Sequence, residues 1–164
     1  MEQGKEEKVA VLILTALVIV LSLLPDTRDT FGLRKGCTVM ARLCYPFVHA
    51  NIFHALANCW CLLSLVFIYN VTRKQLLPAY IIAITYPTVF ITGSPIVGMS
   101  GMCFALFGMI ALRVRRKLYF QFWVLLFLAV GFLFPGAAVW LHLWCYVLGI
   151  VFGLLTTPLS MIKS

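Results

Sequence analysis

Residues 98–112 read GMSGMCFALFGMIAL, and this apolar segment decides how the rest of the chain is interpreted. As an α-helix it would extend only about 22 Å, too short for a hydrocarbon layer of about 30 Å. Arg113 follows directly and fixes the end of this helix at one membrane surface. The other end, with Ser100 in its first turn, is therefore expected to lie recessed below the opposite surface. The loop before it, 93–97, should then be surrounded by protein or a water-filled cavity.

The rest of the chain has the composition of a membrane protein. Of 164 residues, 63% are hydrophobic and 11% are charged, which lies outside the usual range of soluble domains. The sequence therefore predicts an all-α membrane protein, a single domain over residues 1–164 that forms a six-transmembrane-helix bundle with a short, recessed fourth helix. Apolar runs near the length of a membrane span set the expected helices at about 9–24, 50–69, 76–92, 98–112, 118–134 and 139–157.

The distribution of basic residues predicts the orientation in the membrane. With the N-terminus inside, nine Lys and Arg lie on the inner side and four on the outer side, counting Lys163 as inner. Since cytoplasmic loops are enriched in these residues, both termini are expected in the cytoplasm, with membrane lipids as partners of the net charge of +8. The basic run 113–117 is too short and too close to the membrane to indicate nucleic acid.

The first apolar run is interpreted as a retained helix, because its flank is mixed in charge and no small-x-small cleavage site follows Leu24. A bacterial inner membrane is the expected location. Four of the six cysteines fall inside apolar runs, where they behave as small hydrophobic residues. Cys37 and Cys44 lie outside them, and the sequence leaves open whether these two form a bridge.

The polar residues inside the apolar runs are few and share one depth. All five acidic residues precede residue 30, which excludes carboxylate proton relays, aspartyl dyads and glycosidase carboxylate pairs within the later helices. Counted from the inner helix ends, His54, Ser100 and His142 each lie roughly 18–23 Å into the membrane. Asn58 lies four residues after His54 and faces the same way, and His49 precedes this helix.

These residue types support acyl transfer. Ser100 lies where a helix offers free backbone N–H groups and the positive end of its dipole, so an oxyanion could be held there. His54 and Asn58 could donate two further hydrogen bonds to it, and His142 remains as the general base. Small residues should let the fourth and sixth helices approach closely: Gly101, Ala105, Gly108, Gly149 and Gly153. Phe104, one turn after Ser100, could stack on the imidazole.

These motifs resemble the rhomboid family of intramembrane serine proteases. The second predicted helix has two histidines five apart followed by an asparagine four further on, Gly-x-Ser-Gly falls at residues 98–101, and a histidine is followed by glycine seven residues later in the sixth helix. The resemblance implies a Ser100–His142 dyad, an oxyanion hole of His54, Asn58 and the Ser100 amide, and supporting roles for His49, Gly98, Gly101 and Phe104. It also implies no cofactor or metal and single-pass transmembrane proteins as substrates, cut near the outer membrane boundary.

The chain departs from the family pattern at three points. The Trp-Arg pair of the first external loop is missing, Phe104 stands where the family often has Tyr, and Cys145 stands where a glycine is frequent. Alternatives also stay open. Ser100 alone could be a helix cap, and His54 with Asn58 could be interhelical hydrogen-bonding residues. The protein could be a non-catalytic member that binds transmembrane helices, or His54, His142 and Cys145 could bind a metal.

Overall fold

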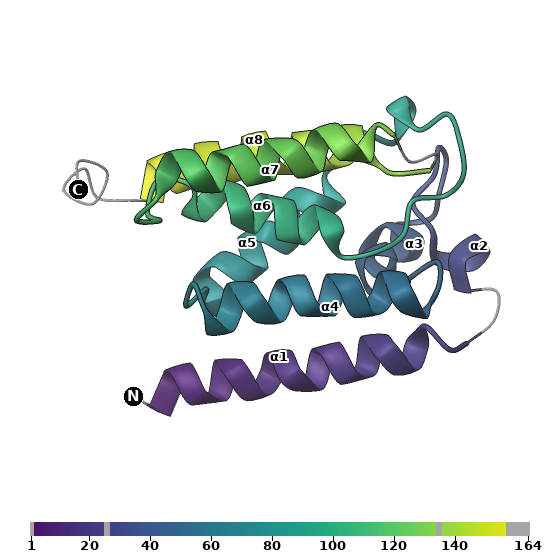
Figure 1. The fold of residues 1–164 in the computed structure, drawn as a ribbon. Coiled ribbons are helices and arrows are strands. Elements are labelled where there is room, and N and C mark those ends of the chain that lie inside the picture. The colour runs from purple at the N-terminus through teal and green to yellow at the C-terminus, as the bar shows by residue number, and fades with distance from the viewer. Residues whose placement is uncertain (1, 25–26, 134–135, 157–164) are drawn as a thin grey trace.

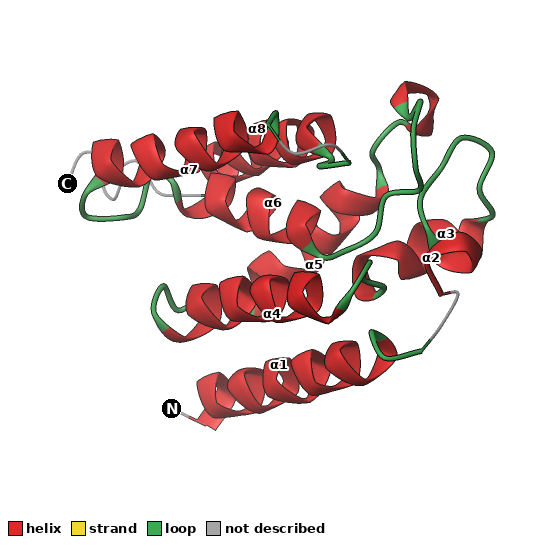
Figure 2. Cartoon of the chain, turned by 45° about the vertical axis from the view of Figure 1, so that its right-hand side comes forward, coloured by secondary structure: helices red, strands yellow, loops and turns green. Residues whose placement is uncertain are grey.

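A computed structural model describes residues 2–24, 27–133 and 136–156. These residues form helices and no strand, apart from one isolated bridge between Leu33 and Ile96 (Figure 2). The predicted helix ends Phe134 and Thr157 lie outside the described residues, as does Lys163. In chain order the elements are α1 Glu2–Leu21, α2 Thr27–Phe31, α3 Val39–Cys44, η1 Tyr45–Phe47, α4 Ile52–Phe67, α5 Arg73–Ile84, η2 Thr88–Phe90, α6 Ser100–Ile110, α7 Lys117–Gly131 and α8 Val139–Thr156.

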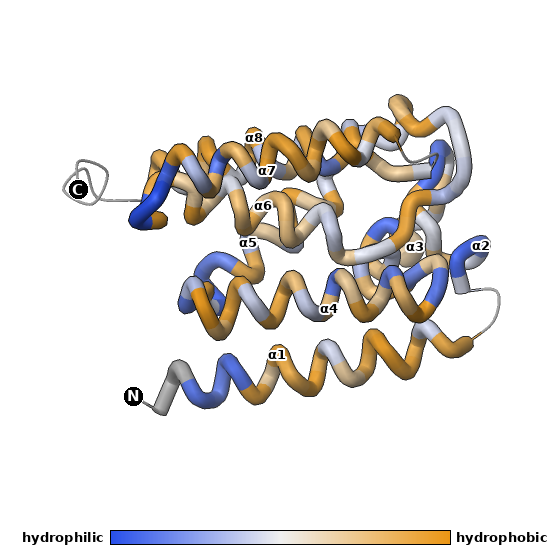
Figure 3. Tube along the Cα trace, viewed as in Figure 1, coloured by the Kyte–Doolittle hydropathy of each residue, from blue (hydrophilic) through white to orange (hydrophobic). Residues whose placement is uncertain are grey.

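The long helices run side by side in alternating directions, with α6 in the middle between α4 on one side and α7 and α8 on the other (Figure 1). The start of α1 and the end of α8 lie at the same end of the molecule. Hydrophilic segments gather at the two ends, and mostly hydrophobic helices fill the length between them (Figure 3). This distribution is typical of a protein whose middle is surrounded by lipid.

Helix lengths support only part of the predicted topology. Among the described residues, α8 is the one helix long and apolar enough to cross a membrane alone, while α6 and α7 are shorter apolar helices. Residues Val39–Phe47 and Ile52–Phe67 pass the same test together, but the chain bends by 78° between them. The all-helical class is therefore confirmed, and the count of six crossings stays a prediction.

Several helix ends differ from the prediction. The helix expected over 76–92 runs from Arg73 to Ile84, and η2 follows it. Pro87 explains the early end, because the residue before a proline is sterically driven out of the α region. Helix α1 begins at Glu2 rather than near residue 9, since Glu and Lys are good helix formers.

The segment before α4 contains structure that the hydrophobic pattern did not indicate, namely α2, α3 and η1. Arg42 holds this segment against the end of α5, because its guanidinium donates to the carbonyl oxygens of Ile84 at 2.7 Å and Tyr86 at 3.0 Å. The fully buried Tyr45 adds a hydroxyl that donates to the carbonyl oxygen of Ala83 at 2.9 Å. We call residues 27–47 the external segment, after the side of the membrane on which the sequence predicts it.

The external segment also holds the loop that leads into α6. Leu33 and Ile96 exchange two backbone hydrogen bonds of 2.8 and 2.9 Å, and the Gly98 amide donates to the Tyr45 carbonyl oxygen at 3.0 Å. Backbone groups of loop 93–97 are therefore hydrogen-bonded in part to protein backbone, which the predicted position of this loop below the membrane surface would require. These bonds fix the position from which α6 starts.

Helix α6 packs against α8 with backbone on backbone, as the small residues predicted. A Cβ on Gly149 would fall on the carbonyl oxygen of Ala105, and a Cβ on Gly153 would lie 2.8 Å from the carbonyl oxygen of Met109. A Cβ on Gly108 would likewise fall on the carbonyl oxygen of Tyr146. Close approach of these two backbones is thus confirmed, and it places the first turn of α6 next to the first turn of α8.

The sequence left open whether Cys37 and Cys44 form a disulfide bond. All six cysteines are free thiols, including Cys37 and Cys44, so these two are not bridged. The Sγ atom of Cys44 contacts the Sδ atom of Met40 at 3.5 Å instead. The external segment is therefore held by hydrogen bonds and packing.

Candidate active site

Ser100 is the first residue of α6, and its side chain meets His142 from the first turn of α8. The Ser100 Oγ atom lies 2.7 Å from the His142 Nε2 atom. When the imidazole carries its proton on Nδ1, the hydroxyl donates to Nε2, which is the geometry needed to remove the hydroxyl proton. Both side chains are half-buried, so the pair is neither sealed in the core nor freely solvated.

Phe104 packs against the imidazole ring of this pair. Its ring stacks on the His142 ring with a centroid distance of 4.5 Å and an interplanar angle of 18°. Because Phe104 lies four residues after Ser100, the same face of α6 supplies both the hydroxyl and the stacking surface. The imidazole orientation is therefore fixed by an aromatic face and the Ser100 hydroxyl.

His54 and Asn58 reach the site from α4, through Gly98. A Cβ on Gly98 would lie 2.7 Å from the His54 Cε1 atom and 3.3 Å from the Asn58 Nδ2 atom, so the bare Gly98 backbone packs directly on both side chains. Gly98 also has a φ of 108°, which L side chains rarely adopt. The pair thus lies against the residue two positions before Ser100, and Gly98 is the residue that permits this.

Asn58 is only 6% exposed and needs partners for its amide. Its Nδ2 atom donates to the His54 carbonyl oxygen at 3.1 Å. An amide nitrogen carries two hydrogens, so one donor remains for another acceptor. The start of α4 is set by Asn51, whose side chain accepts from the His54 backbone amide at 2.8 Å.

The remaining predicted site residues surround this group. His49 is buried at 3% exposure, its two ring nitrogens have no hydrogen-bond partner among the described residues, and its ring meets His54 edge-on at 5.1 Å. Gly101 packs on α8, where a Cβ would lie 2.7 Å from Leu141 Cδ2 and 3.4 Å from Cys145 Sγ.

A metal site of His54, His142 and Cys145 does not form. Within residues 2–24, 27–133 and 136–156, no three His, Cys, Asp or Glu side chains come together as a group that could hold a metal ion. Cys145 is fully buried against Gly101, on the face of α8 that packs on α6. The structure therefore does not bring the three proposed ligands together as one group.

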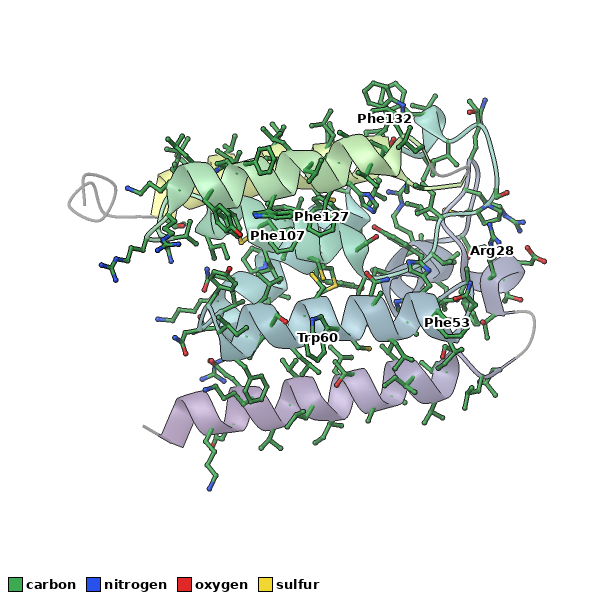
Figure 4. The ribbon with its side chains drawn as sticks, in the orientation of Figure 1. Arg28, Phe53, Trp60, Phe107, Phe127 and Phe132 are labelled. Atoms are coloured by element: carbon green, nitrogen blue, oxygen red, sulfur yellow. The ribbon has the colours of Figure 1, made fainter. Side chains whose placement is uncertain are left out.

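A cavity of about 450 Å³ opens beside the Ser100–His142 pair; we call it the site cavity. It lies between α4, α6 and α7, and most of its lining is apolar. Trp60, Phe107 and Phe127 mark its three sides in Figure 4. The sequence did not mark these residues as cavity walls, because aromatic residues on apolar helices carry no signal that separates cavity walls from core or lipid contacts.

Comparison with known families gives the class of protein. A model of the rhomboid domain matches residues 37–161, a range that contains every candidate site residue. The chain therefore belongs to the rhomboid family, whose members are integral membrane proteins and generally serine proteases, with inactive members among them. No curated protein and no solved structure matches the chain.

Proposed function

We propose that this protein is an intramembrane serine endopeptidase with Ser100 as nucleophile and His142 as general base. The observation that carries the proposal is the 2.7 Å contact between Ser100 Oγ and His142 Nε2 at the start of a helix whose other residues are largely buried. A serine that only capped the helix would need no imidazole on its hydroxyl. The family membership supports the same chemistry.

The reaction proceeds in two steps. Ser100 Oγ attacks the carbonyl carbon of the scissile peptide bond while its proton passes to His142 Nε2. The tetrahedral intermediate collapses as the C–N bond breaks, and the imidazolium gives its proton to the leaving amine. Water then attacks the acyl-enzyme with His142 again as base, which releases the new carboxyl group and restores the Ser100 hydroxyl.

The negative charge of each tetrahedral intermediate needs donors. Three candidates are available: the His54 ring and the free hydrogen of the Asn58 amide, which both lie against Gly98, and the backbone N–H of Ser100 two residues further on. The positive end of the α6 dipole adds to them. No acidic residue follows Asp29 in the chain, so stacking by Phe104 takes the orienting role that an aspartate has in a triad.

The substrates we propose are single-pass transmembrane proteins cut near the outer membrane boundary. An extended backbone in the site would exchange its helical hydrogen bonds for bonds to the enzyme. The site cavity, open between α4 and α7, gives such a segment a route from the lipid to Ser100. We further propose six crossings, both termini in the cytoplasm and a bacterial inner membrane as the location.

The decisive experiment is cleavage of a fluorescent single-span substrate in liposomes by wild type, Ser100→Ala, His142→Ala and Ser64→Ala. Ser64 lines the same cavity without contacting His142, so it is a matched control for loss of a hydroxyl. We expect Ser100→Ala and His142→Ala to lower the cleavage rate at least about a thousandfold, and Ser64→Ala to change it little.

A fluorophosphonate probe gives a second readout that needs no substrate. It should label wild type and the Ser64→Ala variant but not the Ser100→Ala variant. Cleavage by Ser100→Ala would show that the nucleophile is wrong. Wild type that neither cleaves nor is labelled, yet retains substrate helices, would favour the non-catalytic, helix-binding member of the family.

A further inference from the structure

A second cavity of about 450 Å³ adjoins the site cavity at the far end of α6. The two share three lining residues, Tyr69, Phe107 and Phe127, so they form one groove between α4, α6 and α7. Along α6 the lining residues run from Ser100 to Phe107, a length of roughly 11 Å at 1.5 Å per residue. Phe107 and Phe127 lie at its middle (Figure 4).

The far end of the groove is basic. Arg115 and Arg116 line it, both with exposed side chains, next to the aromatic ring of Tyr119. The acidic residues of the chain all precede residue 30, and Glu7 pairs with Arg73 at 3.6 Å. Two adjacent cations at the mouth of an apolar groove are complementary to a ligand with an anionic head and a hydrocarbon tail.

We propose that this groove binds one anionic phospholipid, with its phosphate on Arg115 and Arg116 and an acyl chain along α6 toward the site cavity. Guanidinium groups match phosphate oxygens in both charge and geometry. A free phosphate ion would make no contact with the apolar lining, whereas an acyl chain would cover it.

The site can be tested by lipid binding, independently of catalysis, on the purified Ser100→Ala protein in detergent. Native mass spectrometry would count adducts of dioleoyl phosphatidylglycerol and of dioleoyl phosphatidylcholine. The groove variant is Arg115→Gln with Arg116→Gln. The matched control is Arg34→Gln with Lys35→Gln, since this pair of adjacent basic residues is also exposed but lies in the external segment.

We expect the parent and the control to bind phosphatidylglycerol at least tenfold more tightly than phosphatidylcholine. The groove variant should lose this preference, with phosphatidylcholine binding unchanged. Ser64→Phe places a ring inside the site cavity and should weaken binding of both lipids, which tests the position of the tail.

Three outcomes would overturn the proposal. The groove variant may behave no differently from the control in phosphatidylglycerol binding, in which case the arginines do not hold the headgroup. Glycerol 3-phosphate may displace the lipid at equal concentration, which would show that the apolar groove is not used. A single-span peptide may bind in an arginine-dependent way while the lipids bind every variant alike, which would make the groove a peptide site. Cleavage activity decides none of these, so failure here and failure of the proposed protease function remain distinguishable.

Discussion

The two faces of α6 differ in how they are packed. Toward α8, bare backbones meet, and a methyl group on Gly149 would fall on the Ala105 carbonyl oxygen. Toward α4 and α7, α6 borders a groove of two cavities. The first face fixes the Ser100–His142 contact, which needs an accuracy of a few tenths of an ångström. The second leaves room for ligands beside that contact, so precision and access are built on two different faces of one helix.

The largest effect is expected from a substitution that disrupts the close packing of α6 on α8. Gly149→Ala should lower the free energy of unfolding by about 1–3 kcal/mol or more, because backbone atoms of Ala105 cannot move aside as a flexible side chain would. Reversible unfolding in mixed micelles measures this. Gly93→Ala is the control, since a Cβ there meets nothing within 4 Å. Equal stability of the two variants would contradict the close packing of α6 on α8.

A smaller effect is expected where the tight face reaches the dyad. Phe104→Leu keeps an apolar side chain but removes the ring that stacks on His142 at 4.5 Å. An aromatic pair contributes about 0.5–1.5 kcal/mol, so we expect kcat to fall roughly two- to tenfold with KM little changed. Phe104→Tyr retains the ring and should restore kcat. A rise in KM at constant kcat would instead assign Phe104 to substrate binding.

The smallest effect is expected on the α7 side of the open face. Phe127 is 62% exposed, so Phe127→Ala should change the free energy of unfolding by less than about 0.5 kcal/mol. Phe107 borders the same cavities from α6, but its ring also meets those of Phe104 and Phe120, so Phe107→Ala should cost about 2 kcal/mol. Thermal unfolding of the two variants in one detergent makes the comparison. Equal losses would mean that α7 is packed as firmly as α6.

The sequence alone predicted those parts of the fold that follow from apolar length and helical spacing. The short segment after Gly98 does form the central helix, and Ser100 does begin it. The glycines of α6 and α8 do bring the backbones together, and Ser100 and His142 are within hydrogen-bond distance. Their chemical roles stay predictions, as do the number of crossings and the orientation.

What the sequence did not predict depends on contacts between distant segments. Arg42 was counted only as an external charge, yet it bonds backbone carbonyls at the end of α5. Carbonyl groups are the same in every residue, so no pattern marks these acceptors in advance. The groove could not be predicted for a similar reason. A cavity is space that side chains leave unfilled, and the size of this space depends on how α4 and α7 are tilted relative to each other.

The backbone bonds between the external segment and the loop before Ser100 have a consequence for how this chain can vary. Leu33, Tyr45, Ile96 and Gly98 are joined through main-chain atoms, which side-chain substitution does not remove. What those bonds demand is spacing, because one added or deleted residue would shift the register between two anchors. Apart from Arg42 and Tyr45, whose side chains bond the end of α5, the external segment should therefore accept changes of residue type more readily than changes of length.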